Sequence, residues 1–190
     1  SCMKQIIFLF HFNQNLVPYT KVAIEVCYQG LFNIFEKYSE IPFMVHLSGT
    51  LLNGLQWLAP ELVRKLRQHL VSGHCEGVGS TYAQNVMYST SEADNQQQIK
   101  LHRHLLQKLF ELSPETFWNP ERCWRPELAK LIQEGGYRFT WIEEAILENS
   151  GIPSSASIIE LPCGLKILRD CTAFKEAVNQ AIFKNECELL

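Results

Sequence analysis

The residues best suited to chemistry lie in one short segment, Trp118 to Leu128, which reads Trp-Asn-Pro-Glu-Arg-Cys-Trp-Arg-Pro-Glu-Leu. Its two tryptophans flank Glu121 and Arg122. A carboxylate buried beside aromatic rings carries a large desolvation penalty unless it is paired or used. Glu121 is therefore the first candidate for a functional group. The alternatives are that it pairs with Arg122 or caps the helix that follows.

The sequence predicts strands and helices that alternate along the chain. These elements would position the segment from Trp118 to Leu128. The continuous apolar run at 4–11 predicts a strand buried on both faces, and Ser48 and Ser91 fit helix N-caps. Further strands are predicted at 43–47, 74–79, 116–118, 137–142, 157–161 and 165–168, with helices at 19–37, from 48, at 60–70, from 91, at 126–134 and at 171–183. Such alternation implies parallel strands with helical crossovers, in a doubly wound sheet or a (β/α) barrel.

Ligands of parallel sheets bind at the carboxyl ends of the strands, so polar residues that follow each strand are candidates for a site. We expect these residues to converge on one rim. They are His11, Asn13, Gln14, Ser48, Glu76, Ser80, Asn119, Glu121, Arg122, Glu143 and Glu144.

Composition favours one globular domain over residues 1–190, because 46% of the residues are hydrophobic. The 17 basic and 20 acidic residues form no basic run, which argues against nucleic acid or an anionic membrane as a partner. No apolar stretch approaches the roughly 20 residues of a membrane span. The 7 cysteines include no CxxC pair, which favours a reducing cytoplasm over a disulfide framework. The oligomeric state is left open.

Two carboxylates across a cleft lined by aromatic rings are the apparatus of glycoside hydrolysis. Glu121 is the best candidate nucleophile, and Trp118 or Trp124 could stack on a sugar ring. His11 and Gln14 could hydrogen-bond sugar hydroxyls, although a single histidine at a strand end also fits a core position. Trp57 and Trp141 are expected to pack in the core.

Four segments resemble motifs of glycoside hydrolase family 57, the family of α-amylases, 4-α-glucanotransferases and branching enzymes. Residues 118–128 closely resemble its Trp-x-x-Glu-Arg-x-Trp-x-Pro-Glu-Leu motif. FHFNQN at 10–15 resembles its His-x-His-Gln-Pro motif, and GHCEGV at 73–78 is similar to its Gly-x-x-Glu motif. VHLSGTLL at 45–52 looks like its second-strand segment. Order and spacing agree over residues 4–146.

The resemblance implies an incomplete (β/α)7 barrel and a retaining mechanism on α-glucans, with Glu121 as the nucleophile and no metal or other cofactor. Glu76 would be a supporting or substrate-binding carboxylate. The remaining substrate-binding positions that it implies are His11, Asn13, Gln14, Trp118, Arg122 and Trp124.

The sequence also departs from the family pattern. Asn13 stands where the family usually has a second histidine, and Glu143 and Glu144 stand where it has two aspartates. The family's general acid is an aspartate in a later motif, and neither Asp94 nor Asp170 matches that motif. Without the acid the leaving group is unprotonated and turnover is poor. We therefore expect either the first part of a longer enzyme, incomplete at its C-terminus, or a divergent member that binds without hydrolysis.

Two alternatives remain. A metal-dependent polysaccharide deacetylase has a related barrel, and Gly73-His74 invites that comparison, but such a site needs about three protein ligands. Ser80 stands where a second histidine is expected, and His102 and His104 face different sides of their predicted helix. A non-catalytic carbohydrate-binding module is favoured by the unassigned acid.

Overall fold

The computed structural model describes residues 6–13, 19–152 and 156–185. Its strands form two sheets, ordered β1-β2-β3 and β4-β5-β7-β6. Every pairing is parallel except that of β6 with β7. In the described part of the chain the strands are β1 (Leu9–Phe12), β2 (Phe43–Leu47), β3 (Cys75–Val78), β4 (Thr116–Phe117), β5 (Phe139–Glu143), β6 (Ile158–Glu160) and β7 (Lys166–Asp170).

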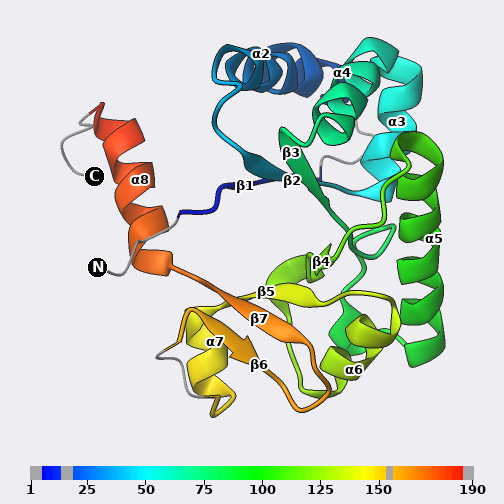
Figure 1. Cartoon of the computed structure of the whole chain (residues 1–190), viewed down its shortest axis with the longest axis vertical. Helices are drawn as coiled ribbons and strands as arrows, with labels where there is room; N and C mark the ends of the chain where they lie inside the picture. Colours follow the sequence, from blue (N-terminus) through cyan, green and yellow to red (C-terminus); the bar gives the residue numbers. More distant parts are fainter. Residues whose placement is uncertain (1–5, 14–18, 153–155, 186–190) are drawn as a thin grey trace.

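A narrow seam joins the two sheets at Gly79, which forms a parallel bridge with Phe117. The Gly79 N–H donates to the Thr116 carbonyl at 2.9 Å, and the Trp118 N–H donates to the Gly79 carbonyl at 2.7 Å. The seam makes β3 and β4 neighbours, so the strands from β1 to β5 lie side by side in chain order. Figure 1 shows the resulting curved wall of strands with helices on its outside.

Helices connect successive parallel strands, as the sequence predicts for crossover connections. None of the helices in the described ranges is long and apolar enough to cross a membrane. They are α1 (Thr20–Ala23), a π-helical segment (Ile24–Tyr28), α2 (Gln29–Lys37), α3 (Gly49–Leu58), α4 (Pro60–Val71), α5 (Glu92–Phe110), α6 (Glu127–Glu134), α7 (Glu144–Asn149) and α8 (Thr172–Lys184), with short 3-10 turns at Met87–Ser89 and Pro120–Arg122.

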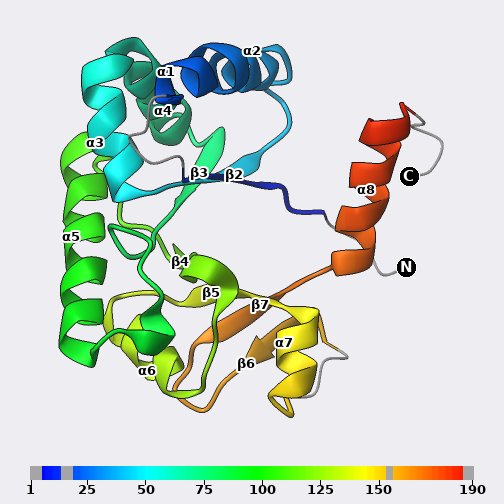
Figure 2. The same cartoon turned by 180° about the vertical axis from the view of Figure 1, so that it is seen from behind.

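Apolar side chains form one cluster behind each sheet. Leu51 and Leu52, both fully buried, belong to the cluster behind the first sheet, whereas Phe117 and Ile132 belong to that behind the second. The long helix α5 contributes to both clusters, and Figure 2 shows it running beside both sheets. It therefore fixes the two sheets relative to each other across the seam.

The predicted fold class is confirmed: parallel strands alternate with helical crossovers in a partial barrel. The strand predicted at 43–47 coincides with β2. Both predicted N-caps are present, since Ser48 Oγ accepts from the Leu51 N–H at 3.2 Å and Ser91 Oγ accepts from the Asp94 N–H at 3.2 Å. Capping satisfies amide donors that the first helical turn leaves unpaired.

Two predictions about packing differ from the structure. Among the described residues the first strand begins at Leu9, and residues 6–8 have no regular structure, although the Phe8 carbonyl accepts from the Met44 N–H of β2 at 2.8 Å; residues 4 and 5 of the predicted strand lie outside the described residues. Trp57, expected in the core, is 88% exposed. The inward face of α3 is formed by Leu51, Leu52 and Leu55, and Trp57 lies on the opposite side of that helix. Trp141 is half-buried.

Candidate active site

Aromatic rings from three strand ends form a stack across the seam. The His11 ring, at the end of β1, lies against the Trp118 ring that follows β4, with centroids 4.4 Å apart and planes 22° apart. The His46 ring of β2 stacks on His11 at 4.9 Å and lies 5.9 Å from Trp118. The first and fourth strands thus contribute neighbouring side chains to one rim, as the carboxyl-end rule predicts.

A chain of hydrogen bonds runs inward from this stack. His11 Nδ1 lies 2.8 Å from His46 Nδ1, and His46 Nε2 lies 2.8 Å from Ser80 Oγ. The Ser80 N–H donates to His102 Nδ1 at 3.0 Å, and His102 Nε2–H donates to the Leu47 carbonyl at 2.9 Å. His46, Ser80 and His102 are fully buried.

Burial keeps these imidazoles neutral. It lowers the pKa of His11 to about 4, with the charge of Arg122 acting in the same direction. It lowers the pKa of His102 to about 4, although the bond to the Leu47 carbonyl opposes the shift. The pKa of His46 is also well below its usual value, because of burial and then the neighbouring His102 and His11. At neutral pH each ring therefore carries a single N–H.

The low pKa of His102 predicts a loss of stability on acidification. The unfolded chain binds a proton near pH 6.5, whereas the folded chain does so only near pH 4. The stabilisation is complete above pH 6.5, and about 3 kcal/mol is lost as the pH falls towards 4. We expect denaturant titrations across this range to show about one fewer proton taken up on unfolding in His102→Gln than in the wild type. His104→Gln, exposed on the same helix, is the control; equal slopes for the wild type and His102→Gln would contradict the assignment.

Glu121 lies in the 3-10 turn that follows β4, and it is exposed rather than buried. Its φ is 55° and that of Arg122 is 54°, so two consecutive non-glycine residues adopt the left-handed region. Each such residue costs on the order of 1 kcal/mol. The turn is closed by the Asn119 side-chain amide, which donates to the Cys123 carbonyl at 2.6 Å. The strained turn therefore holds the Glu121 carboxylate out towards solvent.

Neither structural alternative for Glu121 is found. Its carboxylate makes no hydrogen bond or ion pair with any described residue, so it does not pair with Arg122. The next helix, α6, has Pro126 at its N-cap and no side-chain cap. Among the described residues Glu121 is a carboxylate with its lone pairs available.

Arg122 contacts groups other than Glu121. Its guanidinium lies 5.6 Å from the centroid of the Trp118 ring and forms ion pairs with Glu143, at the end of β5, and with Asp170, at the end of β7, the latter at 3.8 Å. Lys175 of α8 pairs with the same two carboxylates at 3.9 and 3.4 Å. This network joins the ends of β4, β5 and β7. The Arg122 guanidinium, which neighbours Glu121 in sequence, is thus paired with Glu143 and Asp170.

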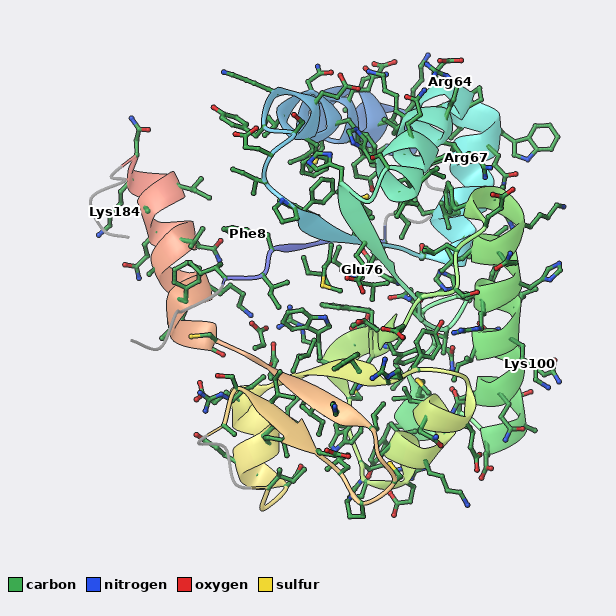
Figure 3. All side chains as sticks on the ribbon, in the orientation of Figure 1. Phe8, Arg64, Arg67, Glu76, Lys100 and Lys184 are labelled. Carbon is green, nitrogen blue, oxygen red and sulfur yellow. The ribbon has the colours of Figure 1, made fainter. Side chains whose placement is uncertain are left out.

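The other predicted site residues occupy different surroundings. Glu76 of β3 is level with Met44 of β2 and so lies nearer the amino ends of the strands than His46. Figure 3 shows Glu76 on the side of β3 that faces the second sheet. Burial, and then the charge of Glu115, raise the pKa of Glu76. Asn13 is exposed directly after β1, and Gln14 lies outside the described residues. Trp124 is only 9% exposed and packs in the cluster behind the second sheet.

The sequence reasoning missed the inner part of this site. The sequence pattern does not single out His46, which lies within an apolar strand; it predicts Ser80 as a rim residue and compares His102 only with a metal ligand. A histidine inside a buried strand is itself a signal, because it needs buried partners. Within the described ranges no three His, Cys, Asp or Glu side chains gather closely enough to hold a metal ion.

The chain matches a family model, related sequences and solved structures. Residues 9–169 match the model of glycosyl hydrolase family 57. The chain is 33% identical over 131 residues to α-amylase 1 of Dictyoglomus thermophilum, which covers 68% of the chain and 19% of that protein. It is 27% identical over 155 residues to the 4-α-glucanotransferase of Thermococcus litoralis, with 79% and 23% covered. The crystal structure of the Thermococcus litoralis 4-α-glucanotransferase has the same fold, with a TM-score of 0.81 and 22% identity over 95% of this chain and 31% of that one.

Proposed function

Because this chain belongs to glycosyl hydrolase family 57, we propose that it acts on α-glucans by a retaining mechanism, as a glycoside hydrolase or a 4-α-glucanotransferase, with Glu121 as the nucleophile. The names of its relatives, α-amylase and 4-α-glucanotransferase, support this substrate class. The matched part of the chain spans 19% of the length of the α-amylase and 23% of that of the 4-α-glucanotransferase. The activity of such a whole enzyme is therefore proposed for this chain.

The observation that carries the proposal is the exposed Glu121 carboxylate, which no described residue pairs with, in the turn that directly follows Trp118, whose ring stacks on His11. A nucleophile must present a lone pair to the anomeric carbon, and no ion pair with a described residue occupies this carboxylate. Attack on that carbon forms a glycosyl ester and breaks the glycosidic bond. Water or a second sugar hydroxyl then attacks the same carbon and gives up its proton to solvent, which releases the carboxylate and restores the original configuration.

The leaving group in that first step needs a proton, and the aspartates of this chain do not supply one. Asp94 accepts from Ser91 Oγ at 2.7 Å at the start of α5. Asp170 is paired with Arg122 and Lys175. Both aspartates are thus engaged by other described side chains, and neither lies in a segment that resembles the family's general-acid motif. We therefore expect substrates that need no protonation to react best.

The proposal is tested by comparing two substrates of the same sugar. Fluoride leaves without a general acid, so we expect α-maltosyl fluoride to release fluoride well above the buffer rate, and maltoheptaose to react much more slowly. Fluoride release with retention of configuration supports the proposal. Binding of maltoheptaose without release from either substrate would make the chain a carbohydrate-binding module. Acetate release from an acetylated saccharide, abolished by EDTA, would make it a deacetylase.

The same proposal places the protein in the cytoplasm as a single barrel-type domain, on the basis of its scattered cysteines and continuous strand and helix alternation. It includes His11, Asn13, Gln14, Glu76, Trp118, Arg122 and Trp124 as substrate-binding residues, and it requires no metal.

A further inference from the structure

The hydrogen bonds of Ser80 decide where its single hydroxyl hydrogen lies. Ser80 Oγ is 2.8 Å from the Thr81 carbonyl oxygen, which can only accept. Without a hydrogen between them, two lone pairs would face each other at that distance. The hydroxyl therefore donates to Thr81, and Ser80 Oγ accepts from Gln84 Nε2 at 2.9 Å.

His46 must then donate to Ser80. Because the Ser80 hydrogen is already committed, the 2.8 Å contact between His46 Nε2 and Ser80 Oγ requires the N–H on His46. A neutral imidazole has one N–H, so His46 Nδ1 is bare. The 2.8 Å contact from His46 Nδ1 to His11 Nδ1 is thus donated by His11.

This assignment leaves His11 Nε2 without a proton. His11 is half-buried, its Nδ1 faces the fully buried His46, and its Nε2 makes no hydrogen bond with a described residue. Stacking on Trp118 fixes the plane of the ring. His102 stabilises the arrangement from behind, since its Nδ1 accepts from the Ser80 N–H and its Nε2–H donates to Leu47.

We propose that Ser80 and His46 are positioning residues that hold His11 in its Nδ1–H tautomer, so that His11 Nε2 accepts a hydrogen bond from a substrate hydroxyl. The part concerning the sugar rests on the proposed function. The opposite tautomer would present an N–H to the substrate instead. The buried Ser80, acting through His46, thus determines whether His11 Nε2 accepts or donates a hydrogen bond at the rim.

The tautomers are measured directly in the ligand-free protein by long-range ¹⁵N–¹H correlation of the histidine rings. In the wild type we expect the proton on Nδ1 of His11 and on Nε2 of His46 and His102. In Ser80→Ala, His46 Nε2–H has no acceptor, so we expect the His11 proton to shift towards Nε2 and the affinity for maltoheptaose to fall about tenfold, the effect of one hydrogen bond.

Thr140→Val is the matched control, because Thr140 is also fully buried and its hydroxyl donates to a backbone carbonyl, that of Phe117, at 2.9 Å. We expect it to change neither the tautomers nor the affinity. A proton on His11 Nε2 in the wild type would overturn the proposal even if Ser80→Ala does not fold. Unchanged affinity in a folded Ser80→Ala would overturn the role in binding. A wild type that binds no maltoheptaose contradicts the proposed function and the substrate contact, and the tautomer measurement still decides the positioning network.

Discussion

Replacing Glu121 with glutamine is expected to lower fluoride release from α-maltosyl fluoride by at least about 10³-fold, because the amide cannot form the glycosyl ester. Binding should persist, since the side chain keeps its size and makes no contact whose loss would destabilise the described part of the fold. Maltoheptaose affinity and unfolding free energy close to those of the wild type would separate loss of chemistry from loss of structure.

A second variant identifies the nucleophile by its product. In Glu121→Gly, azide can enter the space left by the carboxylate and attack the anomeric carbon, so the product of α-maltosyl fluoride should be the β-azide. Glu134→Gln removes a carboxylate from α6, where Glu134 pairs with Lys130 at 3.7 Å, and should react like the wild type. Full activity of Glu121→Gln would remove Glu121 from the mechanism.

Replacing Gly79 with alanine is expected to destabilise the protein by about 2 to 3 kcal/mol, a typical penalty for overpacking a core. A Cβ atom at Gly79 would lie 1.9 Å from the Tyr137 hydroxyl and 2.5 Å from the ring carbon that bears it. Tyr137 is 1% exposed, so its ring has little room to retreat. Because the Trp118 N–H donates to the Gly79 carbonyl, activity should fall as well.

Gly30→Ala is expected to have the opposite effect on stability to Gly79→Ala. Nothing lies within 4 Å of its ideal Cβ position, and Gly30 sits inside α2. Alanine there should stabilise the protein by about 0.5 to 1 kcal/mol, since it reduces the freedom of the unfolded chain. Denaturant unfolding of both variants tests the pair. Equal stability of Gly79→Ala and the wild type would mean that the seam is loosely packed.

Local signals in the sequence were sufficient for most of the elements. The apolar run that became β2 and the N-caps Ser48 and Ser91 depend on residues close together in the chain. The strand-end rule also predicted that residues at the ends of the first and fourth strands would share a rim, and His11 and Trp118, at those two strand ends, stack. The predictions that failed, a strand at residues 6–8 and a core position for Trp57, concern how a segment packs in the fold, which an apolar residue type alone does not encode.

The inner site depends on register between distant strands, which no local pattern encodes. His11 and His46 are 35 residues apart and become neighbours only because β1 pairs with β2 in one register. The ion pairs of Arg122 likewise require Glu143 and Asp170 to be opposite each other on β5 and β7. A shift of one residue in either pairing would turn these side chains to the other face of the sheet.

The antiparallel strand β6 covers the edge of β7, where another strand could otherwise pair. Strand β7 is five residues long, and a bare edge on it would offer a row of unpaired amides and carbonyls to any extended peptide. β6 occupies that edge from Ile158 to Glu160, and its own outer edge is three residues long and ends in a carboxylate. This short, charged edge is a poor template for the pairing of further strands on this side of the sheet.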